Sequence, residues 1–378
     1  MDFDLTPDQK LFRATTKKFL DTEVPLATVR EWADGPDGFA RDWWARGAEL
    51  GWTTLLVPED RGGGSVSDAG LLDLLIVAEE MGRLVSPGPL LPVNTVLAAL
   101  VDAGGHAEEI ESLVCGRAVG TWAVYEPGRG WSPESPGVTA TPTDEGWTLS
   151  GVKDRVEAAD QADLFLVTVR APEGLTQFLV PRGAPGLRVE PLWSLDLVRR
   201  FGEVHFDGVA VPAPALVGRL GAAAPLVERQ RQIASVLQSA ETAGAVDRVF
   251  EFTVAWAFDR YSFGRPLASY QALKHRFADS KTWLEACHGI VSAAGRAVQD
   301  RAPDAAELVA AAACYVGSRA TEIIQDCVQM HGGIGVTWEH DLHLYLRRVT
   351  VNRALYGTPE EHRRALADLV IPSEGVSA

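Results

Sequence analysis

The stretch from Gln329 to Arg348 constrains the fold more than any other part of the sequence. An apolar helical pattern runs into it from about Asp304, and the paired glycines Gly332 and Gly333 must end that helix. Glycine has no Cβ, so backbone N–H groups at such a pair can approach a ligand closely, and an anion is the usual guest. The alternative is a glycine cap followed by an ordinary turn. The stretch therefore predicts a long helix that ends either at an anion-binding glycine pair or at an ordinary glycine cap.

A second motif, RYSFGRPLASYQ over residues 260–271, lies between two further helical patterns. Gly264 breaks the first pattern, and Pro266 suits the first turn of the next helix. The side chain of Arg260 can fork onto phosphate oxygens, the ring of Phe263 can stack on a purine, and the amide of Gln271 can donate to the same phosphates. The alternative is a junction between two helices with a solvated arginine.

The composition limits the classes of protein to which the chain can belong. It has 378 residues, of which 46% are hydrophobic, enough for two or three packed regions. A formal net charge of −16 argues against nucleic acids and anionic membranes as partners, and no apolar run reaches the ~20 residues that span a bilayer. The first residues lack a signal-peptide pattern. Four scattered cysteines without Cys-x-x-Cys spacing argue against a metal site or a disulfide framework, so we expect a cytoplasmic, reduced protein.

Helical and β-like patterns divide the chain into three parts. Residues 1–119 have helical periodicity and begin with a capping box, in which Thr6 is the N-cap and Gln9 the third helical residue. Residues 120–218 change to short β-like runs broken by Pro and Gly, which is typical of a small barrel or sandwich. Long helical patterns return over residues 219–378 and predict a helix bundle.

The two motifs and the order of the three parts resemble the acyl-CoA dehydrogenase family over nearly the whole chain. Three more segments carry the resemblance: GWTTLLVPEDRGG at residues 51–63, SGVK at 150–153 and FDGVAVP at 206–212. The resemblance implies an α+β fold with an N-terminal helical domain, a central β-barrel and a C-terminal four-helix bundle. We place these domains at residues 1–119, 120–218 and 219–378.

The resemblance also implies a cofactor and a reaction. Members bind FAD and desaturate an acyl-CoA thioester between its α- and β-carbons, while a glutamate removes the α-proton. The FAD lies between subunits, so that one subunit's barrel holds the flavin ring and the neighbour's bundle holds the ADP part. In this chain, the residues that the resemblance places at the ADP part are Arg260, Phe263, Gln271, Gln329, Gly332 and Gly333, with Thr358 and Glu360 as further candidates.

The segments that would hold the flavin ring depart from the family's pattern. The family has Thr-Glu-Pro-x-x-Gly-Ser at the first barrel strand, whereas this chain has Tyr125 for the threonine and Trp131 for the serine, unless a one-residue slip lets Ser132 serve. After Lys153 the family has x-Trp-Ile-Thr, whereas this chain has DRVE at residues 154–157. A carboxylate near flavin N5 would oppose the negative charge of a reduced flavin. The alternative is a solvated strand, with Arg155 and Glu157 exposed, in a barrel that binds nothing.

The catalytic base of the family is also missing. One family position for it is Tyr356, which precedes Gly357-Thr358, and a phenol with a pKa near ~10 is a poor base at neutral pH. The other position, on the first bundle helix, corresponds to Ala234. The nearest acid is Glu241, about two turns further along. Glu241 is therefore the candidate base, and the alternative is a buried, paired structural carboxylate.

The residues expected at the ADP part of FAD are intact, whereas the segments expected at the flavin ring are altered. This contrast favours one of three possible roles. Some bacterial members, notably those acting on steroid side-chain CoA thioesters, are α2β2 heterotetramers of two homologous chains. This chain resembles the one that completes the FAD site across the interface. The alternatives are an active homotetramer that uses Glu241 and a non-redox acyl-CoA-binding or scaffold protein. The pairs Arg199-Arg200 and Arg347-Arg348 could contact CoA phosphates, but we interpret them as surface charge or interface salt bridges.

Overall fold

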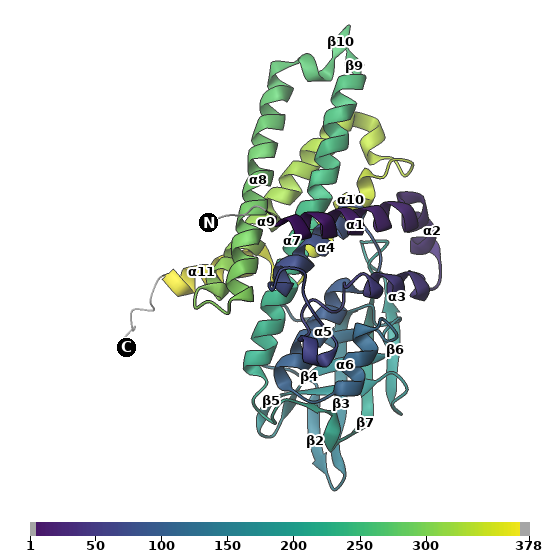
Figure 1. Ribbon diagram of the computed structural model, residues 1–378, viewed down its shortest axis with the longest axis vertical. Helices are drawn as coiled ribbons and strands as arrows, with labels where there is room; N and C mark the ends of the chain where they lie inside the picture. The colour runs from purple at the N-terminus through teal and green to yellow at the C-terminus, as the bar shows by residue number, and fades with distance from the viewer. Residues whose placement is uncertain (1–4, 371–378) are drawn as a thin grey trace. The chain divides into compact units, whose positions relative to one another are not determined.

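The structure is a computed structural model that describes residues 5–370 (Figure 1). The chain divides into two compact units. The helical unit contains the stretches up to Val29 and from Ser235 onward, together with Leu75–Ser86. The sheet unit contains Arg30–Leu74 and Pro87–Ala234. Within residues 5–370, no helix combines the length and the apolar character needed to cross a bilayer.

The predicted capping box begins the first helix. The Thr6 hydroxyl accepts a hydrogen bond from the backbone N–H of Gln9 at 3.2 Å, and the Gln9 side chain accepts one from the Thr6 N–H at 3.1 Å. The structure therefore confirms this helix start. The helices of the first third are α1 (Pro7–Glu23), α2 (Leu26–Asp34), α3 (Arg41–Glu49), the 3₁₀ turn η1 (Glu59–Arg61), α4 (Gly70–Arg83), α5 (Leu90–Ala103) and α6 (Ala107–Val114).

Three tryptophans form the helical part of the sheet unit's core. Trp43 and Trp44 lie on α3, and both pack against Trp52 with ring centroids 5.8 and 6.4 Å apart. All three side chains are buried. Gly47 lies one turn along the same helix, where a Cβ would collide with the Trp52 ring. A glycine is needed there because the ring packs directly on the helix backbone.

The sheet has the strand order β6-β7-β3-β2-β4-β5-β8, and β1 pairs in parallel with β4. The strands at the two ends of this order, β6 and β8, do not pair with each other, so the sheet is open where we expected a closed barrel. The strands are β1 (Gly120–Ala123), β2 (Thr139–Thr143), β3 (Gly146–Glu157), β4 (Leu164–Ala171), β5 (Gly174–Pro181), β6 (Leu187–Leu192), β7 (Phe201–Pro212) and β8 (Leu216–Val217), with the turn η2 (Ala213–Ala215) before β8.

The pairing of β3 with β7 is interrupted near the end of β3. Lys153 pairs with Val204, and pairing resumes only at Val156, opposite Gly202. The intervening Asp154 and Arg155 leave the ladder as a bulge. This bulge falls on the segment that replaces the family's x-Trp-Ile-Thr.

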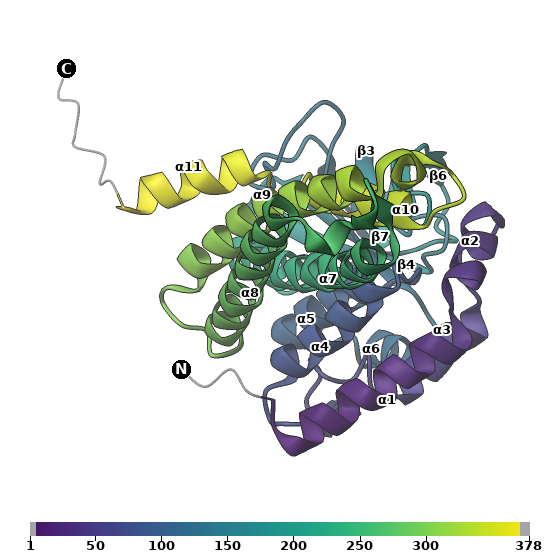
Figure 2. The same ribbon diagram turned by 90° about the horizontal axis from the view of Figure 1, so that it is seen from above.

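The helical unit contains the C-terminal bundle. Its elements are α7 (Ala224–Asp259, whose first residues belong to the sheet unit), β9 (Tyr261–Ser262), β10 (Arg265–Pro266), the turn η3 (Leu267–Ser269), α8 (Gln271–Gln299), α9 (Ala305–His331), the turn η4 (Gly332–Val336), α10 (Leu342–Asn352) and α11 (Pro359–Val370). Figure 1 shows α7 and α8 joined at the β9–β10 hairpin, and Figure 2 shows α11 beside α9, on which it packs. The helix α9 ends at His331, and Gly332 has a φ of 64°, so the predicted helix end is confirmed.

Candidate functional site

The hairpin between α7 and α8 presents the motif at residues 260–271 to solvent. Ser262 pairs with Arg265, which leaves Phe263 and Gly264 as the two turn residues, with φ of 51° and 79°. Positive φ at both positions is the signature of a type I′ turn. The turn leaves the side chain of Phe263 97% exposed. An apolar ring held so far out in solvent is available to a ligand or another chain.

Two details of this motif differ from the sequence prediction. Pro266 is part of the short strand β10 and not of the first turn of α8. The 3₁₀ turn η3 follows it, and α8 begins only at Gln271, which is therefore its first residue and is exposed. The prediction missed the hairpin because the strands β9 and β10 have only two residues each, too few for a periodic pattern.

The two arginines of the hairpin lie over aromatic rings. The Arg265 guanidinium carbon is 3.8 Å from the Tyr270 ring centroid, and that of Arg260 is 5.9 Å from the Trp256 ring centroid. Within residues 5–370, no carboxylate forms an ion pair with either side chain. Both guanidinium groups can therefore accept an external anion such as a diphosphate.

The end of α9 forms the second part of the site. Gln329, Gly332 and Gly333 are exposed, and a Cβ on either glycine would meet no atom within 4 Å. The positive φ of Gly332 explains that glycine as a helix cap. Neither the backbone conformation nor the packing of the chain explains Gly333, and the open space beside it suits close approach by a ligand.

Trp256 joins the two parts of the site, and the sequence analysis did not identify it. Its indole N–H donates to the backbone carbonyl of Met330 at 3.3 Å, and its ring stacks on His331 with centroids 5.3 Å apart. Arg260 lies over the same Trp256 ring, so Trp256 contacts both an arginine of the hairpin and the end of α9. The available signal was the spacing of four residues between Trp256 and Arg260, which lies just past the end of α7.

Thr358 and Glu360 have local roles at the start of α11. The Thr358 hydroxyl accepts from the Glu361 N–H at 3.2 Å, and the Glu361 carboxylate accepts from the Thr358 N–H at 2.7 Å, which is a reciprocal capping box. Glu360 forms an ion pair with Arg353 at 2.9 Å. Thr358 and Glu360 thus have structural partners at α11 itself, and none of these contacts links them to the β9–β10 hairpin.

The candidate base Glu241 lies in a buried ion pair. The Arg348 guanidinium donates to its carboxylate at 2.6 Å, and the Asn352 amide donates at 3.1 Å. The Arg348 side chain is 1% exposed, so the prediction of surface charge at Arg348 is wrong. The arrangement matches the structural alternative for Glu241. The two other family positions, Tyr356 and Ala234, are buried side chains without a carboxylate.

The cavity beside Gly357 is small. A cavity of about 20 Å³ lies there between α7, α9 and α10, next to Thr242 and Gly317. This volume holds about a single water molecule. The pocket is therefore too small for an acyl chain.

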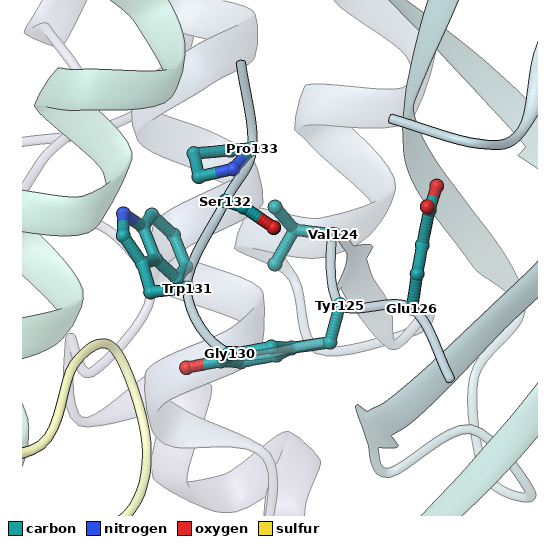
Figure 3. A pocket seen from close by; sticks show the side chains of 7 residues that line it. All are labelled: Val124, Tyr125, Glu126, Gly130, Trp131, Ser132 and Pro133. Carbon is teal, nitrogen blue, oxygen red and sulfur yellow. The ribbon is translucent and has the colours of Figure 1, made fainter. Parts of the chain in front are cut away.

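The pocket at the first barrel strand is also almost filled (Figure 3). It is lined by residues 124–126 and 130–133, and its volume is about 10 Å³, enough for about a single water molecule. The rings of Tyr125 and Trp131 meet edge to face, with centroids 5.5 Å apart, and Trp131 meets Trp122 at 5.7 Å. Figure 3 shows Tyr125 and Trp131 on one side of the segment and Glu126 on the other. Two departures from the family's pattern, Tyr125 and Trp131, are therefore among the side chains that fill this pocket.

A buried ion pair fixes the other side of this segment. The Lys153 ammonium donates to Glu126 at 2.7 Å, and the backbone N–H groups of Gly137 and Val138 donate to the same carboxylate at 2.6 and 3.0 Å. Burial lowers the pKa of Lys153 to about 8, although Glu126 opposes the shift. Burial would raise the pKa of Glu126, but Lys153 and the two N–H groups outweigh it and leave that pKa below its ordinary value.

Glu157 is buried, which contradicts the expectation of a solvated strand. Its carboxylate accepts from Nε of Arg199 at 3.1 Å, and both side chains are less than a tenth exposed. Arg199 is therefore not surface charge either. Sequence reasoning could not find this pair because the two residues lie on different segments of the sheet unit, far apart in the chain.

The two halves of the site differ in whether they fit FAD. The exposed guanidinium groups, the open space beside Gly333 and the exposed Phe263 ring fit the ADP part, which carries two phosphates and a purine. The pocket at Tyr125 does not fit an isoalloxazine ring, because aromatic side chains already fill it.

The helical N-terminal part, the central sheet and the C-terminal bundle correspond in chain order to three domain models of one family of oxidoreductases. The acyl-CoA dehydrogenase N-terminal domain matches residues 6–114, the middle domain matches residues 121–209 and the C-terminal domain matches residues 230–371. The chain belongs to the acyl-CoA dehydrogenase family, whose members are FAD-dependent oxidoreductases acting on CH–CH bonds.

Individual relatives span the whole chain. Acyl-CoA dehydrogenase IpdE2 of Mycolicibacterium smegmatis is 29% identical over 364 residues, covering 96% of this chain and 98% of its own. In the ChsE4–ChsE5 complex of Mycobacterium tuberculosis, the matching chain is 26% identical with a TM-score of 0.86, over 98% of this chain and 99% of that chain. The steroid acyl-CoA dehydrogenase Tcur3481–Tcur3483 is 26% identical with a TM-score of 0.86, over 96% and 97%.

Proposed function

We propose that this chain is a subunit of an FAD-dependent acyl-CoA dehydrogenase and supplies the ADP side of the FAD site to a homologous catalytic chain. The observation that carries the proposal is the contrast between a filled pocket and an exposed surface. The pocket at Tyr125 has a volume of about 10 Å³, whereas Arg260, Phe263 and Gly333 face open solvent. A chain whose pocket at Tyr125 is filled, but whose Arg260, Phe263 and Gly333 remain exposed, is suited to bind the ADP part of an FAD held by a partner chain.

When bound, FAD would supply a hydride acceptor for the β-carbon of an acyl-CoA whose α-proton is removed by a base. The residues of this chain bind and orient the ADP part and leave the chemistry to the partner. Arg260 would fork onto the diphosphate, and the backbone at Gly333 would approach it closely. Phe263 would cover the adenosine part, and the amides of Gln271 and Gln329 would donate to polar atoms nearby. The two candidates at α11, Thr358 and Glu360, would act there only after leaving their present contacts.

The partner we propose is a homologous chain that carries the Thr-Glu-Pro and Trp-Ile-Thr patterns this chain lacks. The structural likeness to chains of ChsE4–ChsE5 and Tcur3481–Tcur3483 supports a heterotetramer acting on a bulky, steroid-type acyl-CoA. An active homotetramer would need Glu241 as its base, and the Arg348 ion pair counts against that. A scaffold that has lost FAD would not need an open arginine clamp.

The test uses the complex of this chain with its homologous partner. Replacing Arg260 or Gln329 by alanine should weaken FAD binding to the complex, because a hydrogen bond from a charged donor such as Arg260 contributes roughly 1.5–3 kcal/mol and one from a neutral amide such as Gln329 roughly 0.5–1.5 kcal/mol. We expect R260A to weaken FAD binding by about tenfold or more, measured by flavin absorbance after gel filtration. The matched control is R364A, which removes an exposed arginine from α11. An R260A/Q329A complex with wild-type FAD affinity would contradict the proposal.

A further inference from the structure

We propose that Arg155 keeps the pocket at Tyr125 closed. Its side chain acts as a strap, by which we mean that its contacts link the segment 125–132 to β3. These contacts exclude a flavin ring from this chain's own sheet unit. The inference rests on the proposed function, in which only the partner's sheet unit holds a flavin ring. It goes further by naming the side chain that holds the filled pocket together and the substitutions that would open it.

The backbone at Arg155 is shaped for this contact. Arg155 lies in the bulge between Lys153 and Val156, outside the β3–β7 ladder. Its φ of 49° is a left-handed conformation that is unfavourable for a residue with a Cβ. Such a conformation persists only where surrounding contacts hold it in place. The contacts of the Arg155 guanidinium provide that hold.

The guanidinium contacts the segment 125–132 at three points. Nη2 donates to the backbone carbonyl of Arg129 at 2.6 Å and to that of Glu126 at 3.3 Å. The guanidinium carbon lies 4.5 Å from the Tyr125 ring centroid. Nε donates to the neighbouring Asp154 at 2.9 Å, which fixes the orientation of the fork. The Asp154 N–H in turn donates to the Tyr125 carbonyl at 2.9 Å, so the bulge and the segment are joined on both sides.

The strap holds the aromatic side chains where they fill the pocket. Tyr125 is 6% exposed and meets Trp131 edge to face, as Figure 3 shows. Further along β3, Glu157 is held by Arg199. Four ring-side residues that depart from the family's pattern, Tyr125, Trp131, Arg155 and Glu157, thus all make buried or bridging contacts. The flavin ring is therefore excluded by contacts that these side chains make, and not only by the loss of residues that would bind it.

The first test removes the strap alone and measures amide hydrogen exchange across residues 125–132. We expect R155A and R155G to exchange at least about tenfold faster there, because two bonds from a charged donor to carbonyls are lost. R155G also relieves the left-handed backbone, so the chain should stay folded. The control is R188A, at an exposed arginine of β6 that pairs with Glu190. Exchange as slow as in the wild type in both Arg155 variants would overturn the proposal.

The second test restores the family's pattern with Y125T/W131S/R155W/E157T and titrates the isolated chain with riboflavin. Riboflavin has the ring without the ADP part, so the result does not depend on Arg260 or Gln329. We expect saturable binding at least about tenfold tighter than that of the wild type, measured by quenching of flavin fluorescence. A folded variant that binds no better, or a wild-type chain that binds riboflavin equally well, would overturn the inference. If the variant does not fold, the exchange result decides. Failure of the proposed function would appear separately, as an R260A complex that keeps its FAD.

Discussion

At the scale of single residues, Glu241 and Arg348 determine whether this chain carries a base of its own. Both are buried, and Arg348 also donates toward the Ser86 carbonyl at 3.5 Å. Burying two charges costs desolvation energy, which close contact and further hydrogen bonds offset. Asn352 supplies one of those further bonds to Glu241 and another to Thr242. A carboxylate held in this way stabilises the packing of α7 against α10.

Removing one member of this pair should therefore be costly. R348M leaves the Glu241 carboxylate buried beside an apolar side chain, and we expect a loss of about 3–5 kcal/mol in the free energy of unfolding. E241Q/R348M should recover much of that loss, because no charge remains buried. Urea unfolding of the isolated chain measures both.

The control for this prediction is R353M. Arg353 and Glu360 form an exposed pair, with 41% and 52% of the side chains accessible, and such pairs contribute about 1 kcal/mol or less. Equal losses in R348M and R353M would show that Glu241 is not held as a structural carboxylate. Glu241 would then again be a candidate base.

At the scale of elements, helix ends could be predicted from the sequence, whereas a two-residue hairpin, a bulge and a long-range ion pair could not. The capping box at Thr6 and the glycine that ends α9 depend on neighbouring residues, and both were predicted. The β9–β10 hairpin and the bulge at Arg155 were not, because each depends on a few residues with positive φ. The pairing of Glu157 with Arg199 required the fold of the sheet to be known. The sequence therefore identified which pocket was altered but not that its own side chains fill it.

The contact between α1 and α4 contains a titrating group. Glu80 on α4 lies 3.4 Å from Arg13 of α1 and 3.9 Å from Arg83. Burial raises the pKa of Glu80 from 4.5 to about 7, although the two arginines oppose the shift. Between these two pH values the folded chain holds a proton that the unfolded chain has released. The contribution of Glu80 to stability is therefore present below pH 4.5 and is lost as the pH rises toward 7.

We predict that E80Q flattens the pH dependence of stability over this interval. The linkage relation gives roughly 3 kcal/mol for the wild-type change that the variant should lack. Chemical unfolding at a series of pH values measures it, with E307Q, at an exposed glutamate of α9, as the control. A difference between E80Q and wild type that stays constant from pH 4.5 to 7 would contradict the prediction.

At the scale of the whole molecule, charge and exposure point to the same surface. The chain carries a net charge of −16, yet Arg260 and Arg265 have no carboxylate partner among residues 5–370. Exposed apolar side chains accompany them at the end of α7 and on the hairpin, namely Phe258, Tyr261 and Phe263. A basic and aromatic surface on an acidic protein is suited to an anionic ligand with an aromatic part. The small cavities beside Gly357 and beside Tyr125 do not have room for such a ligand.

The most direct test of this account is the FAD content of the chain, purified alone and in complex with its homologous partner. The account predicts no FAD on the isolated chain and about one FAD for every two chains in the complex, because each pair of chains completes one site. Flavin absorbance after acid release, divided by protein concentration, gives the ratio. An isolated chain that carries a full complement of FAD and is bleached by an acyl-CoA would contradict the account.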